Sequence, residues 1–330
     1  MNALPSSPAK PAPTLPAQPR GLHAVVVGGG TMGADVATVL ARGGCRVSVV
    51  EPQEKSRLAL AQRVQFALDE LGIGHRAAQV QSMPELAALD WHDVGLVVEC
   101  IPEQLALKQA LFAQLVQHAP TTAVLTSNSS SFPISAIAQD LPSAERMLGL
   151  HFFMPAHLVP LVEVVLGPHT AEATAQSLCT FMRGCGSVPV LVRKDKPGFL
   201  ANRLQHALSR EAFALIDEGV ATPEDVDAAV RFGFGFRYLA AGPVLQRDHA
   251  GLDVHCAAAA TMYPSLSNTD QPARALRERV EAGRLGMKAG AGFYTWNEAD
   301  KAAERVRYDQ LLRQGLRLLA DELPPIDKSF

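Results

Sequence analysis

The sequence predicts an α/β protein in which a doubly wound, mostly parallel sheet is followed by a second, all-α domain. Three observations support this fold class. Short apolar β runs alternate with helical patterns over the first 195 residues, which is typical of parallel strands joined by helices. After Lys196-Pro197-Gly198 the β signal fades, and only helical patterns follow. The chain has 330 residues, 48% of them hydrophobic, which is enough for two buried cores.

The expected elements follow one another along the chain. Apolar runs bounded by glycine or polar residues indicate strands within 23–30, 45–51, 94–102, 122–130, 146–153, 161–165 and 187–193. Helical patterns occupy 31–44, 53–71, 103–118, 171–183, 199–219, 223–232, 243–263, 272–283 and 301–320. We therefore expect a disordered, proline-rich tail over 1–20, a sheet domain over 21–195 and an all-helical domain over 196–330.

Charge and cysteine usage exclude several classes of protein. The formal net charge is −3 and the pI about 6.4, with no basic stripe, so we expect no nucleic-acid partner. No apolar run is long enough to span a bilayer, so we expect no membrane partner. Five cysteines are scattered without a CxxC pair. This pattern favours reduced thiols in a cytoplasmic protein and indicates no metal site.

A glycine-rich turn after the first strand indicates a dinucleotide site. Gly28, Gly30 and Gly33 fit the G-x-G-x-x-G pattern, with Thr31 and Met32 inside it. The first glycine allows the tight turn, the second lets the backbone approach a pyrophosphate, and the third lets helix and strand pack closely. The helix N-terminus then presents free N–H groups to the phosphates. This strand–turn–helix context predicts a Rossmann-like domain.

The acidic residue that ends the second strand indicates which dinucleotide binds. Glu51 lies eighteen residues after Gly33, where a carboxylate can accept hydrogen bonds from a ribose diol. Its charge would repel a 2′-phosphate. We therefore expect NAD rather than NADP as the cofactor. The alternative is a glycine turn that holds no ligand.

A histidine and a glutamate in two neighbouring β runs indicate a site of proton transfer. His151 opens the stretch HFFMPAHLVPLVEVV, and Glu163 lies twelve residues later in its apolar second half. A buried carboxylate is unfavourable unless a partner compensates it. If the two runs pair, Glu163 would raise the basicity of His151, which could then remove a hydroxyl proton while hydride leaves for NAD. The residues alone equally allow a histidine bound by backbone groups and a glutamate paired with a lysine.

Four motifs, in this order, resemble the L-3-hydroxyacyl-CoA dehydrogenase family. They are the glycine turn, SNSSS at 127–131, HFF…PLVEVV at 151–165 and KPGFLANR at 196–203. The likeness extends from about Leu22 to Tyr294. It implies an NAD-dependent enzyme of fatty acid metabolism that forms a homodimer through its helical domain.

The resemblance also implies roles for single residues. His151 would be the general base and Glu163 its partner, while Ser130 and Asn202 would bind the substrate oxygen. Three more residues match the family's cofactor contacts: Glu103, Lys108 and Lys288. Without the resemblance, Ser130 and Asn202 would be caps of a turn and a helix, and the lysines would be solvated surface charges.

Two departures from the family pattern concern the substrate site. Met154 stands where the family has asparagine, and a thioether cannot replace the hydrogen bonds of an amide. Glu103 follows Glu51 by only 52 residues, and the stretch QRVQFALDELGIGHR between them offers no cation for CoA phosphates beyond Arg63 or Arg76.

A third departure is Arg237 in the stretch FGFGFRYLAAGP. The superfamily branch that includes carnitine dehydrogenase and the lambda-crystallin type is similar here, arginine included. A guanidinium can bind a free carboxylate through two hydrogen bonds. The alternative is a surface charge at a helix end.

These features lead to three hypotheses. The first is NAD-dependent oxidation of an L-3-hydroxyacyl-CoA to the 3-oxo compound, or the reverse, with His151 and Glu163 as the base pair. The second is a dehydrogenase of a free short 3-hydroxy acid of the carnitine, gulonate or hydroxybutyrate type, bound by Arg237. The third is a non-catalytic, crystallin-like protein that binds NAD.

Overall fold

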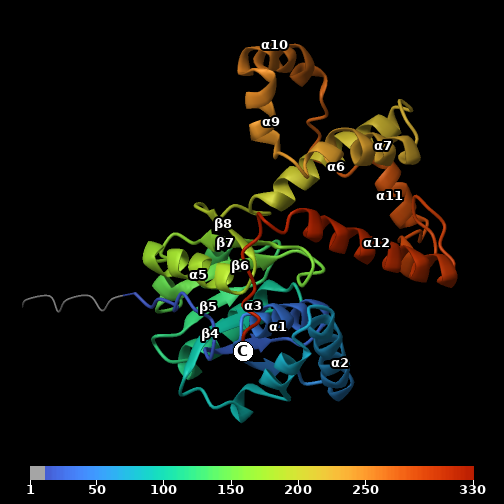
Figure 1. Ribbon diagram of the computed structural model, residues 1–330. Coiled ribbons are helices and arrows are strands. Elements are labelled where there is room, and N and C mark those ends of the chain that lie inside the picture. Colours follow the sequence, from blue (N-terminus) through green and yellow to red (C-terminus); the bar gives the residue numbers. More distant parts are fainter. Residues whose placement is uncertain (1–11) are drawn as a thin grey trace, which may run out of the picture. The chain divides into compact units, whose positions relative to one another are not determined.

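The computed structural model describes residues 12–330, which divide into two compact units (Figure 1). The first, here called the sheet unit, contains the chain up to Leu200 together with Glu322–Phe330. The second, the helical unit, is Ala201–Asp321. The division lies near the expected boundary at residue 195. The return of 322–330 to the sheet unit differs from the expected second domain over 196–330.

The sheet unit is built on one eight-stranded sheet with the order β3-β2-β1-β4-β5-β6-β7-β8. The strands are β1 (His23–Val27), β2 (Arg46–Val50), β3 (Val80–Met83), β4 (Val94–Glu99), β5 (Val124–Ser127), β6 (Met147–Phe152), β7 (Leu161–Leu166) and β8 (Val188–Val192). Neighbouring strands are parallel except β6 and β7, which are antiparallel. The expected, mostly parallel sheet is confirmed, and only β3 was not expected.

Helices cover both faces of the sheet, which makes it doubly wound. One face packs against α1 (Thr31–Arg42), α2 (Glu54–Glu70) and α5 (Glu172–Gly184), and the other against α3 (Leu105–His118) and α4 (Ile134–Ile137). Successive side chains of a strand point to opposite faces, so alternate residues enter the two cores. The strands read as continuous apolar runs because both of their faces are buried.

Residues 13–20 pack on the sheet unit, so the expectation of a disordered tail is wrong for this part of the chain. Leu15 is buried, and its backbone N–H donates to Ser177 Oγ of α5 at 3.0 Å. Thr174 Oγ1 donates to the Pro13 carbonyl at 2.7 Å. A proline lacks an N–H group but keeps a carbonyl that can accept, so a proline-rich chain can still bind a helix surface. Residues 1–11 of the expected tail lie outside the described residues.

The segment 322–330 is held on the sheet unit by a buried arginine. Arg76 donates to the carbonyls of Arg42 and Asp327, both at 2.5 Å, and of Phe330 at 3.1 Å. Its guanidinium also lies 3.8 Å from the centroid of the Phe330 ring. The sequence offered Arg76 as a cation for CoA phosphates, but its side chain is fully buried and serves this packing instead.

The helical unit confirms the expected all-α second part. Its helices are α6 (Ala201–Asp217), α7 (Pro223–Ala229), α8 (Gly235–Arg237), α9 (Pro243–Ala250), α10 (Leu252–Met262), α11 (Arg274–Glu281) and α12 (Glu298–Leu318). A π-helical stretch, Val230–Phe234, joins α7 to α8. The single helix expected over 243–263 is divided at Gly251, because its φ of 94° is outside the helical range.

The helical unit buries little of its own apolar surface. Ala241 and Ala275 are its buried hydrophobic residues, whereas Phe232 and Val244 are 74% and 78% exposed. Large apolar side chains are more often exposed on surfaces that bind another molecule. The sheet unit, in contrast, contains two buried cores, one on each face of its sheet.

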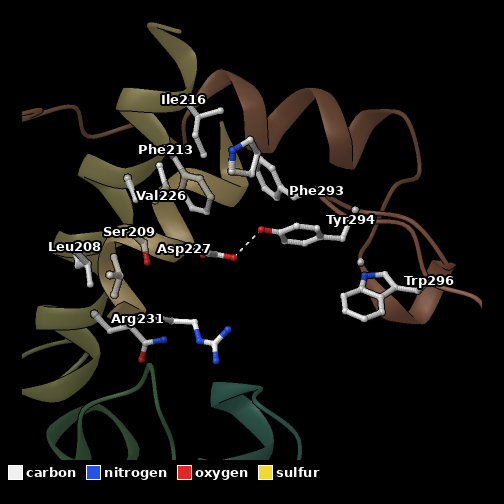
Figure 2. A pocket seen from close by; sticks show the side chains of 16 residues that line it. Leu208, Ser209, Phe213, Ile216, Val226, Asp227, Arg231, Phe293, Tyr294 and Trp296 are labelled. Carbon is white, nitrogen blue, oxygen red and sulfur yellow. Dashed lines mark hydrogen bonds between the residues drawn. The ribbon is translucent and has the colours of Figure 1, made fainter. Parts of the chain in front are cut away.

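A cavity of about 510 Å³ lies within the helical unit between α6, α7 and the segment 286–296 (Figure 2). Its lining is mainly apolar, and the Phe213 and Phe293 rings stack there with centroids 5.4 Å apart. Tyr294 Oη donates to Asp227 Oδ2 at 2.7 Å. Burial and this acidic partner raise the pKa of Tyr294 to about 12. The phenol therefore stays protonated at neutral pH and joins α7 to the segment 286–296.

Candidate active site

The glycine turn lies between the end of β1 and the start of α1. Gly28 has a φ of 102°, and a Cβ there would lie 2.6 Å from the Cys100 carbonyl oxygen. A Cβ on Gly33 would lie 1.8 Å from the Gly28 carbonyl oxygen. These two positions therefore require glycine for the turn and for the packing of α1. A Cβ on Gly30 would meet nothing within 4 Å, which leaves space for a ligand to approach the backbone.

The start of α1 and the end of β2 complete this site. α1 begins at Thr31 and Met32 with no side chain capping it, so its first N–H groups are available to a phosphate. Glu51 directly follows β2, and its Oε2 accepts the Gly29 N–H at 2.9 Å. Its Oε1 accepts the Gln53 N–H at 2.9 Å. The carboxylate is thus fixed beside the turn and keeps further lone pairs for ribose hydroxyls. These residues fit a bound NAD.

His151 and Glu163 face each other directly across the antiparallel pair β6–β7. The imidazole Nδ1 lies 2.7 Å from the carboxylate Oε2, and the two residues are 2% and 0% exposed. The other carboxylate oxygen, Oε1, accepts the Leu200 backbone N–H at 3.0 Å. The imidazole and the carboxylate are therefore bonded to each other, which is one of the two arrangements that the sequence allowed. A carboxylate bound at Nδ1 leaves Nε2 as the nitrogen that exchanges a proton.

The second nitrogen of His151 lies beside an exposed serine. Ser130 Oγ is 3.0 Å from Nε2. Asn128 Oδ1, two residues earlier, accepts the backbone N–H of the residue after His151 at 2.9 Å, which ties the serine loop to β6. The rings of Phe153 and Phe199 lie 4.6 and 5.4 Å from the imidazole centroid. These contacts fix the orientation of the imidazole relative to Ser130.

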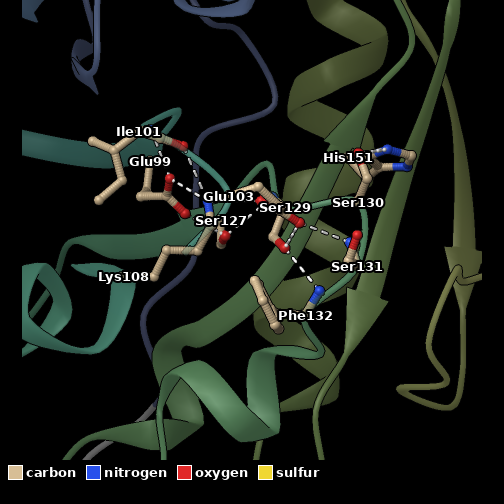
Figure 3. A network of polar contacts seen from close by, with 10 residues as sticks. All are labelled: Glu99, Ile101, Glu103, Lys108, Ser127, Ser129, Ser130, Ser131, Phe132 and His151. Atoms are coloured by element: carbon tan, nitrogen blue, oxygen red, sulfur yellow. Dashed lines mark hydrogen bonds and ion pairs between the residues drawn. The ribbon is translucent and has the colours of Figure 1, made fainter. Parts of the chain in front are cut away.

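A second buried carboxylate, Glu99, ends β4 on the same face of the sheet. Its Oε1 accepts from Lys108 Nζ and from the Ile101 N–H, both at 2.7 Å, and its Oε2 accepts from Ser127 Oγ at 2.5 Å (Figure 3). Lys108 Nζ also lies 3.3 Å from the Ile101 carbonyl oxygen and 3.2 Å from Glu103 Oε2. The alternative of Lys108 as a solvated surface charge is wrong, because its side chain is buried. All three donors of its ammonium group have partners.

Glu103 connects this cluster to the serine loop. Its Oε1 accepts from Ser129 Oγ at 2.6 Å and from the Ser131 N–H at 2.9 Å. Partial burial raises the pKa of Glu103, but the bonds from Ser129 and Ser131 and the charge of Lys108 outweigh it and hold the pKa below its usual value. The carboxylate is therefore ionised at neutral pH. Its side chain is 39% exposed and can accept hydrogen bonds from a ligand.

Two buried carboxylates were not among the expected site residues. Glu99 carries the same sequence signal as Glu163, because VGLVVE and LVEVV both place a single acidic residue in an apolar strand. Asp35 is the other one, and like Glu99 and Glu163 it is a buried acidic residue in an apolar element, the helix α1. A search for lone carboxylates in apolar runs would have found all three.

Three expected site residues belong to the helical unit. Asn202 is the second residue of α6 and is partly exposed, Arg237 is the exposed last residue of α8, and Lys288 is exposed in a 3₁₀ turn, Met287–Ala289. The structure groups the other expected residues in the sheet unit. The roles expected for Asn202, Arg237 and Lys288 in binding substrate or cofactor remain predictions.

Sequence comparison shows which protein family the chain is similar to. Residues 23–196 match the family model described as 3-hydroxyacyl-CoA dehydrogenase, NAD binding domain, and residues 198–296 match the model of the 3-hydroxyacyl-CoA dehydrogenase C-terminal domain. The chain belongs to the 3-hydroxyacyl-CoA dehydrogenase family. As a member of the 3-hydroxyacyl-CoA dehydrogenase family, it is an NAD-dependent oxidoreductase that acts on CH–OH groups. This membership favours an enzyme over the hypothesis of a non-catalytic protein.

Relatives in the 3-hydroxyacyl-CoA dehydrogenase family differ in their substrates. The chain is 34% identical to the 5-formyl-3-hydroxy-2-methylpyridine 4-carboxylate 5-dehydrogenase of Mesorhizobium japonicum, over 86% of this chain and 94% of the relative. It is 35% identical to the 3-hydroxybutyryl-CoA dehydrogenase of Mycobacterium tuberculosis, over 82% of this chain and 97% of the relative.

Solved structures show the same two kinds of relative. A 5-formyl-3-hydroxy-2-methylpyridine 4-carboxylic acid 5-dehydrogenase, described as an NAD⁺ dependent dismutase, matches with a TM-score of 0.83 at 30% identity, over 91% of this chain and 99% of that chain. The (S)-3-hydroxybutyryl-CoA dehydrogenase of Ralstonia eutropha matches with a TM-score of 0.69 at 29% identity, over 84% of this chain and 99% of that chain.

In the described part of the chain, no helix is both long and apolar enough to cross a membrane.

Proposed function

We propose that this enzyme oxidises a small free carboxylic acid that carries a CH–OH group, with His151 as the general base and Glu163 as the residue that orients it. The observation that supports the base assignment is the contact of 2.7 Å between His151 Nδ1 and Glu163 Oε2. Ser130 Oγ lies 3.0 Å from Nε2, so a substrate hydroxyl bound by Ser130 would lie beside the nitrogen that accepts its proton.

Proton transfer would proceed through residues that are already in place. When bound, NAD supplies the acceptor for the hydride that leaves the substrate carbon. His151 Nε2 takes the hydroxyl proton, and Glu163 stays ionised and stabilises the imidazolium. The Leu200 N–H holds the second oxygen of Glu163, so the pair needs little reorganisation as charge develops. Ser130 and Asn202 would bind the reacting oxygen.

The cofactor contacts divide into direct and indirect ones. Glu103 is ionised and partly exposed, so it can bind a hydroxyl of NAD directly. Lys108 has its three donors engaged within the protein, so we assign it the role of holding Glu103. Lys288, in the helical unit, is exposed and remains a proposed contact of NAD.

Two observations favour a free acid over a CoA thioester. The cations considered for CoA phosphates are engaged elsewhere, since Arg63 Nε bonds Asp35 Oδ1 at 2.8 Å and Arg76 is buried. The relative whose name specifies a pyridine carboxylate matches with a TM-score of 0.83, against 0.69 for the 3-hydroxybutyryl-CoA enzyme. Arg237 is exposed and would bind the substrate carboxylate.

A panel of substrates tests this choice. NAD reduction would be followed with free 3-hydroxybutyrate, carnitine, gulonate and 5-formyl-3-hydroxy-2-methylpyridine 4-carboxylate, and with 3-hydroxybutyryl-CoA and a longer 3-hydroxyacyl-CoA. We expect kcat/KM for at least one free acid to exceed that of both thioesters by more than ~10-fold, about 1.4 kcal/mol. A preference for either thioester would overturn the free-acid assignment and leave the base assignment standing.

Replacing the proposed clamp provides a second test. Arg237→Ala should raise KM for the preferred acid by roughly 10–100-fold, the effect of losing a charged hydrogen-bond pair, and change a thioester far less. Arg277→Ala, at an exposed arginine of α11, is the matched control and should change neither. Equal losses for acids and thioesters would show that Arg237 does not bind the carboxylate.

Oxidation of an L-3-hydroxyacyl-CoA is the second candidate function. It is favoured by the family models, which match both the NAD-binding and the C-terminal domain of 3-hydroxyacyl-CoA dehydrogenases. In that case fatty acid metabolism would be its setting, and the same base pair would act on the 3-hydroxyl group. The cytoplasmic compartment expected from the cysteines stays a prediction.

We also propose a homodimer formed through the helical unit. The support is the apolar surface that this unit leaves exposed, including Phe232, Phe236 and Val244. Light scattering should give twice the mass of the chain, and Val244→Asp with Phe236→Asp should shift the mass toward that of one chain. A single-chain mass for the parent protein would refute the dimer.

A further inference from the structure

The buried Asp35 lies on α1, two residues after the last glycine of the turn. Its side chain is almost fully buried, and the helix around it, GADVATVLAR, is otherwise apolar or small except for Thr38 and Arg42. A carboxylate at such a position destabilises the fold unless several groups compensate it. The glycine turn does not require it, because the turn is made by Gly28, Gly30 and Gly33.

Compensation comes from two other elements of the sheet unit. Arg63 of α2 donates from Nε to Asp35 Oδ1 at 2.8 Å. The Ala156 backbone N–H donates to Oδ2 at 3.0 Å, and His157 Nδ1 lies 3.2 Å from Oδ1. Burial raises the pKa of Asp35, but the contacts with His157 and Arg63 outweigh it and hold the pKa below its usual value. The carboxylate is therefore charged at neutral pH.

Ala156 and His157 belong to the loop 153–160 that joins the two catalytic strands. This loop begins directly after β6, which carries His151, and ends at β7, which carries Glu163. Inside the loop, the N–H groups of Leu158 and Val159 both donate to the Pro155 carbonyl, at 3.0 and 2.9 Å. The loop therefore forms a compact turn, and a bond to one of its residues positions the whole turn.

We propose that Asp35 is a positioning residue that fixes the loop 153–160 to α1 and thereby sets the distance between the catalytic base and the cofactor turn. This deepens the proposed function and rests on it. α1 begins at the glycine turn, and β6 ends one residue after His151. One carboxylate thus joins the element that carries the pyrophosphate site to the loop that follows the base. A displacement of about 1 Å at a catalytic group can lower the rate by ~10²-fold.

The test compares three variants with a matched control. Asp35→Ala removes all contacts to the loop, Asp35→Asn keeps one acceptor for the Ala156 N–H, and Arg63→Met removes only the contact from α2. The control is Thr38→Val, a buried polar position one turn later whose Oγ1 donates to the Ala34 carbonyl of its own helix. Each variant would be measured for kcat, NAD affinity, Tm and hydrogen exchange of the amides 156–159.

We expect Asp35→Ala to lower kcat by roughly 10–100-fold and to speed exchange of the Ala156 amide by at least ~10-fold, with NAD affinity changed by less than ~3-fold. Asp35→Asn should show a smaller loss of kcat. Thr38→Val should lower Tm without changing kcat or exchange in the loop. If Asp35→Ala does not fold, kcat and loop exchange of Asp35→Asn and Arg63→Met are compared with those of Thr38→Val instead.

The outcomes separate this proposal from the proposed function. Faster loop exchange with parental kcat would refute the positioning role. Unchanged hydrogen exchange in the loop would show that Asp35 does not hold the loop 153–160 to α1. If Thr38→Val lowers Tm as much as Asp35→Ala does and also lowers kcat as much, the loss of kcat is explained by lower stability. A parent protein inactive on every substrate of the panel would refute the proposed function, while the exchange measurement would still decide whether Asp35 holds the loop.

Discussion

Glu99 and Glu163 are both fully buried carboxylates on one face of the same sheet, yet their surroundings differ. Glu99 accepts from Lys108, from Ser127 and from a backbone N–H, so both of its oxygens are bound inside a closed cluster. Glu163 accepts from a backbone N–H and lies against the imidazole of His151. Through Lys108 the first network continues to a second carboxylate, that of Glu103, which is partly exposed. The second leads to Ser130, which is exposed.

The difference lies in what each partner can do with a proton. An ammonium group with three bound donors has no acceptor and no free N–H group. An imidazole bound at Nδ1 can still gain or release a proton at Nε2. Burial of a carboxylate therefore does not mark a catalytic site by itself. The partner decides whether the carboxylate supports chemistry or the local fold.

Replacing the imidazole should produce the largest effect on catalysis. His151→Gln keeps a hydrogen-bonding side chain but removes the proposed base, so kcat should fall by on the order of 10³-fold or more. NAD affinity, measured by fluorescence titration, should stay near that of the parent, because the glycine turn and Glu51 are untouched. Turnover at the parental rate would show that another group is the base.

Breaking the closed cluster should affect stability rather than chemistry. Lys108→Met leaves Glu99 buried without its cation, and removing one partner of such a pair lowers the free energy of unfolding by about 3–5 kcal/mol. The measurement is denaturant unfolding at pH 7. The expected loss of kcat is smaller than for His151→Gln.

The double variant Lys108→Met with Glu99→Gln is the control for this prediction. It removes both charges, so most of the lost stability should return. A double variant as unstable as Lys108→Met alone would mean that packing, and not the unpaired charge, explains the loss.

Replacing Glu163 should give an intermediate effect on kcat, on the order of 10²-fold. In Glu163→Gln a single carbonyl oxygen must serve both the Leu200 N–H and the imidazole. If the oxygen stays with Leu200, the amide NH₂ group faces Nδ1 and favours the proton on Nε2, where the base needs a lone pair. The pH profile of kcat should change as well as its height. An unchanged kcat would remove Glu163 from the mechanism.

The sequence predicted the parts of this molecule that depend on local pattern. The strands β1, β2 and β4 to β8 were indicated by apolar runs, and the glycine turn by its spacing. The His151–Glu163 pairing was one of two arrangements that the residues allowed equally. β3 was not expected, since its four residues, VQSM, lie at the sheet edge and carry no apolar alternation. Proteins often keep an edge strand short and polar, because one of its sides has no neighbouring strand.

Contacts between distant segments were beyond what the sequence pattern could give. Arg76 was considered as a ligand contact because the pattern shows a cation in a loop, and nothing local indicates that Phe330 covers it. The packing of residues 13–20 on α5 has the same cause, because its bonds join segments about 160 residues apart. Glu99 is a different case, since the lone-carboxylate signal was present in VGLVVE.

The smallest expected effect concerns Glu103, which links the closed cluster of Glu99 to the loop of Ser130. The pKa of Glu103 is lowered in the folded protein. A lowered pKa stabilises the fold above the unfolded value of about 4.3, and this contribution is lost as the pH falls through the folded value. Glu103→Gln should therefore lower Tm slightly at pH 7, and the difference from the parent should shrink below roughly pH 4.

The matched control for Glu103 is Glu298→Gln, whose carboxylate is exposed and pairs with Lys301 at 2.6 Å. Water and salt screen that pair, so its change in Tm should be smaller at pH 7 and should vanish in high salt. The effect of Glu103→Gln should persist in salt, because Ser129 and Ser131 also bind its carboxylate. If the two variants respond alike to salt, Glu103 is a surface charge, and the closed cluster does not extend to the serine loop.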